Sequence, residues 1–530
     1  MAKPLAVLSQ QCPRSRSGGQ ETPALANLRT AVIVFLICLY LLPLWIFKYF
    51  PTQDGPSHLY NSQVLREFRN PDYRFREYYD LNLSLFPNWL SHVSLAMLMA
   101  VFSPITAEKI LLSLYVIMFP LAIFYFLNSV NKGRNLIGLM SFLFIYNYLF
   151  LMGFYNFAFS VPLFFLALGF WWKDKEHITV KRIILLNLLL AVIYFAHLIS
   201  YITLLLSITL LSVFYFRKRF KKILLTLGGL LPSSILLFNY LQSSHLLSGG
   251  APQLGFSRAW QLLKELGSLR ILVSYSQGQS TIAYLVSALM LAMFIYTLWK
   301  AKPAHPGSSL EKSTGRGSFL LLYFVLFVLY LILPRDLGPG GWINERMAIF
   351  VLLGILAWFR ESDSRAWKRA FIILVGFISL ANIACIINDC RILNKELAEY
   401  TLGTKRIENN KIILPLYFDG YGKSQKVGIF INASNYYCLN NGGINLGNYE
   451  VQYDYFPVHF KDSFKPPAEG KEWVQTVFGR PMDIDISGYS DKVDYLLLWG
   501  KPDPTTAGAI RKSYHLIASK GRLKILKPNK

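Results

Sequence analysis

The feature that most constrains this chain is a series of apolar runs, each about 18 residues long, that recurs along most of its length. An α-helix needs about 20 apolar residues to cross a bilayer, and the core of a soluble domain does not require so many runs of that length. The chain has 530 residues, of which 53% are hydrophobic. The sequence therefore predicts an α-helical polytopic membrane protein.

The basic residues predict how the chain is oriented. They gather in short clusters between the apolar runs and give a net charge of +24. Basic loops remain in the cytoplasm, so topology explains this charge and we expect no nucleic-acid partner. About eleven spans put every cluster inside, provided that the short apolar segment Trp89–Ser103 does not cross the membrane. The predicted spans are 31–48, 106–128, 136–150, 157–172, 183–197, 200–216, 223–241, 281–299, 318–333, 347–359 and 370–388.

Three regions follow from this topology. Residues 1–30 form a cytoplasmic N-terminal arm, 31–388 the membrane module with a first outer loop at 51–105, and 389–530 an extracytoplasmic domain. In the last region the apolar runs shorten to about five or six residues, as in a small α/β domain. The expected strands are Lys411–Phe418, Val427–Ile431, Val451–Val458, Asp494–Trp499 and Leu523–Leu526, and the expected helices are Ala398–Ile407 and Thr506–Ile510.

The first outer loop begins with Pro-Thr-Gln-Asp-Gly-Pro-Ser-His, which places Asp54 just beyond the first span and His58 one helical turn later. Two interpretations stay open. Asp before Gly-Pro is a good helix N-cap and needs no other role. Alternatively, the carboxylate faces the layer in which a lipid-phosphate donor presents its sugar, with His58 on the same face of the helix.

Glycosyl transfer from a polyprenyl-phosphate sugar suits a single carboxylate. The leaving phosphate is stable as an anion, so no second carboxylic acid has to protonate it. One base must take the proton of the acceptor, and positive charge must hold the phosphate. We therefore predict Asp54 as the general base, with His58 orienting either Asp54 or the acceptor.

Candidates for the phosphate site lie in Pro334–Arg346, where a run of glycines lets backbone N–H groups approach an anion. Arg335 and Arg346 supply the charge. An arginine at the outer end of a span opposes the positive-inside bias, so Arg346 should have a local partner. That partner is either the phosphate or a carboxylate of Glu345 or Asp336.

Two further polar residues fall on the same outer face. His197 marks the tip of a helical hairpin in Ile183–Phe216, and Asn156 ends the stretch Tyr146–Asn156. Both are candidates for substrate binding, although a lone histidine in an apolar segment is more often a packed residue. The outer loops contain no Asp-x-Asp, Walker, Gly-x-Ser-x-Gly or His-Glu-x-x-His pattern, which argues against nucleotide use and against zinc or serine hydrolysis.

The arrangement resembles the GT-C superfamily of integral-membrane glycosyltransferases, which includes protein O-mannosyltransferases and aminoarabinose transferases of lipid A. The span count, the long first outer loop and Thr-Gln-Asp-Gly-Pro-Ser-His carry the resemblance. It implies that Asp54 occupies the catalytic position and that Arg346 matches the arginines that hold the lipid phosphate. Many members read Asp-Glu where this chain has Asp-Gly. Some branches use a divalent metal and others lack one, so the resemblance assigns no cofactor here.

Two other functions stay open. A transporter or flippase of lipid-linked sugars needs charged groups inside its spans, and these are nearly absent. A non-catalytic scaffold of envelope assembly would use the outer domain to bind a partner. We expect a transferase in a bacterial inner membrane, with membrane lipids around it, a polyprenyl-phosphate sugar as donor and a glycan, lipid or protein as acceptor.

Overall fold

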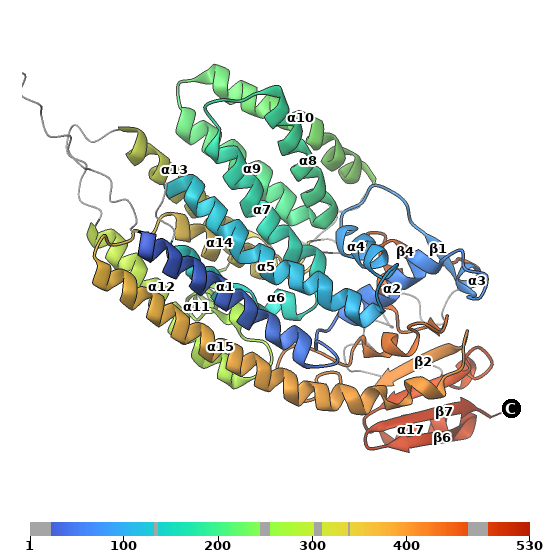
Figure 1. Ribbon diagram of the computed structural model, residues 1–530. Coiled ribbons are helices and arrows are strands. Elements are labelled where there is room, and N and C mark those ends of the chain that lie inside the picture. The colour runs from blue at the N-terminus through green and yellow to red at the C-terminus, as the bar shows by residue number, and fades with distance from the viewer. Residues whose placement is uncertain are drawn as a thin grey trace, which may run out of the picture.

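A computed structural model describes residues 23–131, 136–243, 255–300, 310–337, 340–464 and 486–529, so most of the predicted arm 1–30 lies outside the described residues. Long helices run side by side, and a small sheet lies at one end of them (Figure 1). The membrane module contains α1 (Pro23–Ile46), α5 (Pro104–Asn131), α6 (Tyr148–Leu151), α7 (Tyr155–Lys173), α8 (Val180–Ala196), α9 (Leu198–Phe216), α10 (Phe220–Ser243), α11 (Phe256–Gly267), α12 (Gln277–Lys300), α13 (Leu310–Ile332), α14 (Ile343–Gly354) and α15 (Arg365–Tyr400).

The helices confirm the expected class of fold. Among the described residues, seven helices are long and apolar enough to cross a membrane, and the protein is an integral membrane protein. The other predicted spans fall on α8, on the shorter apolar part of α13 (Gly317–Ile332), on α14 and on the pair formed by the 3₁₀ helix η1 (Leu136–Phe144) and α6. Helix α4 (Leu90–Leu98) has nine residues and is about 14 Å long, which is too short to cross a membrane and agrees with the condition set for Trp89–Ser103.

Helix α15 carries the chain out of the membrane module. Ser364 caps it by accepting a hydrogen bond from the backbone N–H of Trp367, and the helix then continues for 36 residues. The predicted boundary at residue 389 therefore falls inside this helix. Beyond the apolar run, the helix still buries one face at helical spacing, through Ile386, Cys390, Leu393, Leu397 and Tyr400.

A mixed five-stranded sheet forms the core of the C-terminal region, in the order β3-β2-β5-β7-β6. Strand β2 is parallel to β3 and β5, and β7 is antiparallel to β5 and β6. The sequence correctly predicts β2, β5, β7 and helix α17, and it misses β3 and β6. The bounds are β2 (Ile412–Tyr417), β3 (Ile444–Asn445), β5 (Tyr495–Trp499), α17 (Pro504–Ser513), β6 (Tyr514–Lys520) and β7 (Leu523–Pro528).

Two predicted strands are wrong. Val427–Ile431 forms turns, and Val451–Val458 is mostly the end of the 3₁₀ helix η7 (Tyr449–Gln452) and the turns after it. Their apolar residues are buried, but against the first outer loop, where Gly428 N–H donates to Gln53 Oε1 at 3.1 Å. In both segments the apolar run therefore correctly indicated burial, but not a strand.

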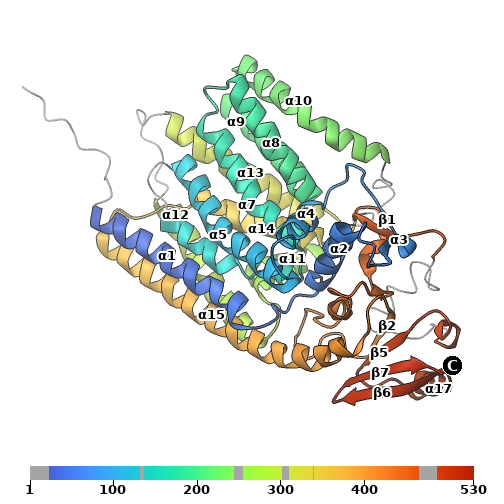
Figure 2. The same ribbon diagram turned by 45° about the vertical axis from the view of Figure 1, so that its right-hand side comes forward.

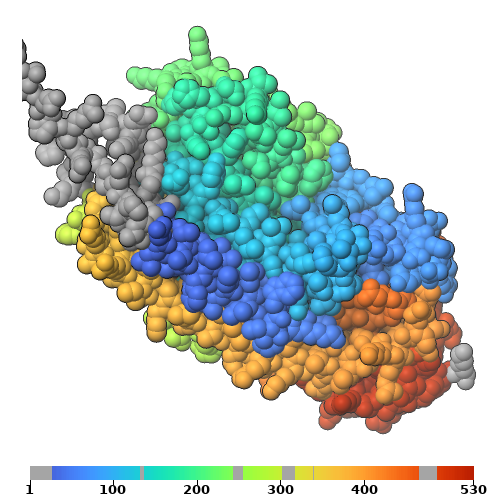
Figure 3. Space-filling view, viewed as in Figure 1, coloured from blue at the N-terminus to red at the C-terminus, as the bar shows by residue number. Residues whose placement is uncertain are grey.

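The first outer loop is joined to the C-terminal region by a second, two-stranded sheet. Strand β1 (Tyr79–Leu81) pairs antiparallel with β4 (Val458–Phe460), and the rings of Tyr79 and Phe460 stack at 5.1 Å. Helices α2 (Gly55–Glu67), α3 (Phe75–Tyr78) and α4 lie at the same end of the molecule as this sheet (Figures 1 and 2). In the space-filling view the two regions meet without a visible gap (Figure 3).

Candidate functional site

A cavity of about 310 Å³ brings together most of the predicted site residues. Asp54, His58, Asn156, His197 and Arg346 all line it, although they come from four separate parts of the sequence. Arg335 and Glu345 are not among the lining residues. Much of the remaining wall is aromatic and is formed by Phe154, Phe157, Tyr240, Trp342, Tyr449, Tyr453, Tyr455 and Phe456.

Asp54 is held as a buried carboxylate at the start of α2. Its side chain makes no capping hydrogen bond, so the cap interpretation does not describe this side chain. Instead, Asp54 Oδ1 accepts hydrogen bonds from Gln53 Nε2 at 3.2 Å and from Asn432 Nδ2 at 2.8 Å. Only 5% of the residue is exposed. The sequence indicated Asp54, but not the amide from the C-terminal region that holds it.

Burial raises the pKa of Asp54 to about 7, because a charged carboxylate loses hydration there. Hydrogen bonds from Gln53 and Asn432 act in the opposite direction, and the negative charge of Glu450 adds to the rise. A carboxylate with a pKa near neutrality both accepts and releases a proton readily at physiological pH. Asp54 therefore has the protonation behaviour that a general base requires.

Close packing behind Asp54 depends on two glycines. Gly153 has φ +85°, and a Cβ there would lie 2.7 Å from the backbone nitrogens of Asp54 and Gly55. A Cβ on Gly55 would collide with Tyr155 and would lie 2.7 Å from Glu108 Oε1. Tyr155 donates to this same oxygen at 2.7 Å. The Asp-Gly of this chain thus leaves room for a buried Glu108–Tyr155 pair.

Arg346 lines the cavity and lies near two aromatic rings. Its guanidinium lies 5.1 Å from the ring of Phe154 and 5.5 Å from that of Phe157. Among the described residues it forms no ion pair with Glu345 or Asp336, and its Nε has no hydrogen-bond acceptor. Neither of the two carboxylates expected as partners, Glu345 and Asp336, therefore pairs with Arg346.

Arg335 lies apart from this group. Its side chain is exposed, and its guanidinium is 5.8 Å from the ring of Trp342, which itself lines the cavity. The glycine-rich segment Pro334–Arg346 is described except for residues 338 and 339. Of the two predicted phosphate ligands, the structure brings only Arg346 to the cavity wall.

His197 and Asn156 both have local structural partners. His197 lies between α8 and α9, at the predicted hairpin tip, and its Nδ1 accepts a hydrogen bond from Ile199 N–H at 3.2 Å. Asn156 donates to the carbonyl of Asn88 at 2.9 Å and accepts from Ser91 N–H at 2.7 Å. Both residues line the cavity while they also hold the ends of helices in place.

His58 contacts two residues that the sequence did not indicate. His58 Nδ1 lies 3.2 Å from His92 Nε2 and 3.2 Å from Glu450 Oε1, while no direct contact joins its ring to the carboxylate of Asp54. Burial lowers the pKa of His58 to about 4, so this ring is neutral at pH 7. The available signals were a histidine within the apolar segment Trp89–Ser103 and a glutamate at the edge of an aromatic stretch.

Comparison with known proteins supports the architecture. No protein-family profile and no curated protein sequence matches the chain. Among solved structures, it matches the crystal structure of ArnT from Cupriavidus metallidurans bound to undecaprenyl phosphate. The TM-score is 0.56 at 10% sequence identity, over 96% of this chain and 98% of that one. The chain therefore shares the overall fold of this ArnT structure, as the resemblance to the GT-C superfamily led us to expect.

Proposed function

We propose that this protein is a glycosyltransferase that moves a sugar from a polyprenyl-phosphate donor to an acceptor on the outer face of the membrane. One observation carries the proposal. A buried carboxylate of raised pKa, Asp54, lines the same cavity as Arg346, which forms no ion pair with any residue that the structure describes. The fold adds support, because the ArnT structure that it matches is bound to undecaprenyl phosphate.

In this proposal Asp54 acts as the general base. The acceptor heteroatom attacks the anomeric carbon of the donor sugar, and the bond from that carbon to the phosphate oxygen breaks. The proton of the acceptor passes to Asp54, and the electron pair of the broken bond leaves with the phosphate. Because the phosphate leaves as an anion, the site needs no separate acid to protonate it.

Arg346 holds the donor phosphate. A guanidinium forms two parallel hydrogen bonds with a phosphate, and its positive charge stabilises the negative charge that develops on the leaving group. Aromatic residues such as Tyr449 and Phe456 supply flat surfaces against which a sugar ring packs. The proposal assigns Arg335 and Glu345 no part in this step, because neither lines the cavity.

The proposal is tested in cells that lack the protein and are complemented with wild type, Asp54→Asn or Asp80→Asn. Asp80 is an exposed carboxylate in the same outer loop, so Asp80→Asn is a matched chemical change outside the cavity. Mass spectrometry of lipid-linked sugars and envelope glycans is the measurement. We expect cells with Asp54→Asn, like the deletion, to accumulate a polyprenyl-phosphate sugar and to lack one glycan modification, while Asp80→Asn behaves as wild type.

Two results would overturn the proposal. In the first, the deletion leaves every lipid-linked sugar and every glycan unchanged. In the second, Asp54→Asn restores the modification as fully as wild type does, which would leave the buried carboxylate without a catalytic role. Immunoblotting of membrane fractions establishes that each variant is present in equal amount.

A further inference from the structure

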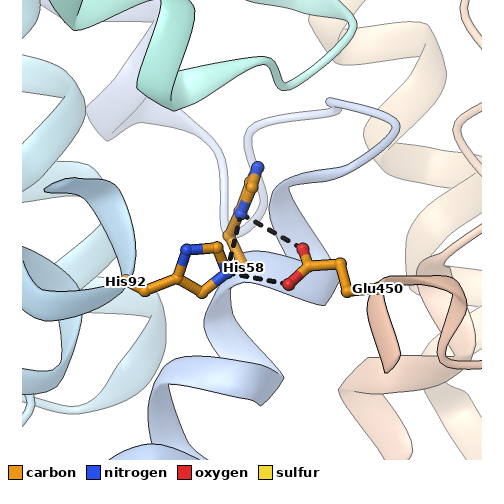
Figure 4. A group of neighbouring side chains, drawn as sticks. All are labelled: His58, His92 and Glu450. Carbon is orange, nitrogen blue, oxygen red and sulfur yellow. Dashed lines mark hydrogen bonds and ion pairs between the residues drawn. The ribbon is translucent and has the colours of Figure 1, made fainter. Parts of the chain in front are cut away.

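Three buried side chains from distant parts of the sequence converge beside the cavity. His58 comes from α2, His92 from α4 and Glu450 from η7 (Figure 4). All three are buried, and a ligand atom from each lies within 4.8 Å of the others. His58 also lines the cavity that contains Asp54. The group therefore joins the first outer loop to the C-terminal region at the edge of the proposed active site.

The spacing of these atoms matches a tetrahedral metal site. Ligands that each lie about 2.0–2.1 Å from a zinc ion are separated from one another by about 3.3 Å. His58 Nδ1 lies 3.2 Å from both His92 Nε2 and Glu450 Oε1. His92 Nε2 lies 2.7 Å from Glu450 Oε2, and small rotations of the side chains widen that contact. Three ligands leave one position of the tetrahedron for a further ligand.

The contacts of His92 fit those of a metal ligand. Its Nδ1 lies 3.2 Å from the carbonyl oxygen of Asn88, which only accepts, so Nδ1 carries the hydrogen. In a neutral ring the lone pair is then on Nε2 and points towards Glu450 and His58. Metal-binding histidines have this pattern, since their other ring N–H donates to a carbonyl or carboxylate.

Glu450 independently indicates that a cation binds between the three residues. Its Oε1 is buried and has no hydrogen-bond donor among the described residues, because the 3.2 Å contact with His58 Nδ1 lacks hydrogen-bond geometry. A buried carboxylate oxygen left in this way is costly. Its other oxygen, Oε2, accepts from Asn61 Nδ2 at 2.8 Å, so the carboxylate is oriented from outside the group. A cation between the three residues would satisfy Oε1 and the two ring nitrogens together.

We propose that His58, His92 and Glu450 bind a divalent cation, with zinc as the best match. Two imidazoles and one carboxylate form a donor set typical of zinc, whereas magnesium and calcium prefer oxygen ligands alone. The ion holds α2, α4 and η7 together, which fixes one wall of the cavity. This binding is separate from the transfer reaction, so its test does not depend on that reaction.

The test uses the full-length protein in detergent. The protein is stripped with a chelator and returned to a chelator-free buffer, and zinc chloride is then titrated against a fluorescent zinc indicator. Elemental mass spectrometry gives the number of zinc ions bound per chain. We expect one zinc per chain, and a higher melting temperature with zinc than without it. His92→Ala and Glu450→Gln lower the affinity by more than about 100-fold, since even partners of metal ligands are worth about 10- to 100-fold.

Two further variants make the result specific. Asn61→Ala removes the hydrogen bond that orients Glu450 and weakens zinc binding by about 10-fold. His515→Ala removes an exposed histidine of β6 and leaves the affinity unchanged. If the wild type retains no zinc, the group is an imidazolium–carboxylate pair and the proposal is wrong. It is also wrong if correctly folded His92→Ala binds zinc as wild type does. Should both ligand variants fail to fold, the wild-type titration and Asn61→Ala still decide the matter.

Discussion

The carboxylate of Asp54 and the side-chain amide of Asn432 lie 2.8 Å apart, although 378 residues separate them in the sequence. This hydrogen bond connects the start of the first outer loop to the C-terminal region. Neither segment forms the proposed catalytic group alone, since Asp54 supplies the base and Asn432 stabilises its anion. The C-terminal region is therefore part of the site.

The pH dependence of the reaction reports the environment of Asp54. Burial raises the pKa of Asp54 to about 7, and the general base acts when ionised, so kcat/KM rises with pH and levels off above pH 7. Asn432→Ala removes a hydrogen bond that favours the anion, which moves the rise to higher pH. Steady-state rates between pH 5.5 and 9 provide the measurement. Identical profiles for wild type and Asn432→Ala would show that Asn432 does not act on the base.

Asp54→Asn should stabilise the folded protein in alkaline solution while it abolishes activity. The pKa of Asp54 is about 7 in the folded state, whereas its ordinary value of 3.8 applies to the unfolded chain. The folded state therefore binds this proton more tightly, and it loses stability as the pH rises from 3.8 to about 7. Asparagine carries no charge and avoids that loss. The melting temperature of Asp54→Asn exceeds that of wild type at pH 8, and the difference shrinks towards pH 5. Asp80→Asn, at an exposed site, shows no such trend.

Arg346→Gln should weaken binding of the donor. Hydrogen bonds between a charged arginine and phosphate contribute about 1.5–3 kcal/mol, so we expect the KM for the polyprenyl-phosphate donor to rise by about 10- to 100-fold. Arg346→Lys keeps the charge but cannot form the two parallel hydrogen bonds, so its KM for the donor lies between that of wild type and that of Arg346→Gln. The control is Arg511→Gln, an exposed arginine in α17. An unchanged KM in Arg346→Gln would remove Arg346 from the phosphate site.

Gly55→Ala tests the packing behind the site. The new Cβ would collide with Thr52 and Tyr155 and lie 2.7 Å from Glu108 Oε1. Forcing a methyl group into a filled space costs about 1–3 kcal/mol, so the melting temperature and the activity both fall. Gly508→Ala is the matched control, because no heavy atom lies within 4 Å of its added Cβ. Equal melting temperatures for Gly55→Ala and wild type would contradict this description of the packing.

The sequence predicted the parts of the protein that local patterns determine. Apolar run length indicated the spans, and the position of Asp54 after the first span indicated the candidate base. It did not predict contacts formed between distant segments, such as those of Asn432 with Asp54 and of Glu450 with His92. No period or motif in either segment encodes such a pairing. The buried run Val427–Ile431 misled for the same reason, since it packs on the outer loop without joining a sheet.

The central claim is tested most directly by adding purified protein to a lipid extract of cells that lack it, because such an extract contains accumulated donor. Mass spectrometry then follows the polyprenyl-phosphate sugar and the free polyprenyl phosphate over time. With wild type, we predict that the first disappears as the second appears in equal amount, and that Asp54→Asn lowers this rate by at least about 100-fold. The absence of conversion by wild type, or equal rates for wild type and Asp54→Asn, would contradict the account.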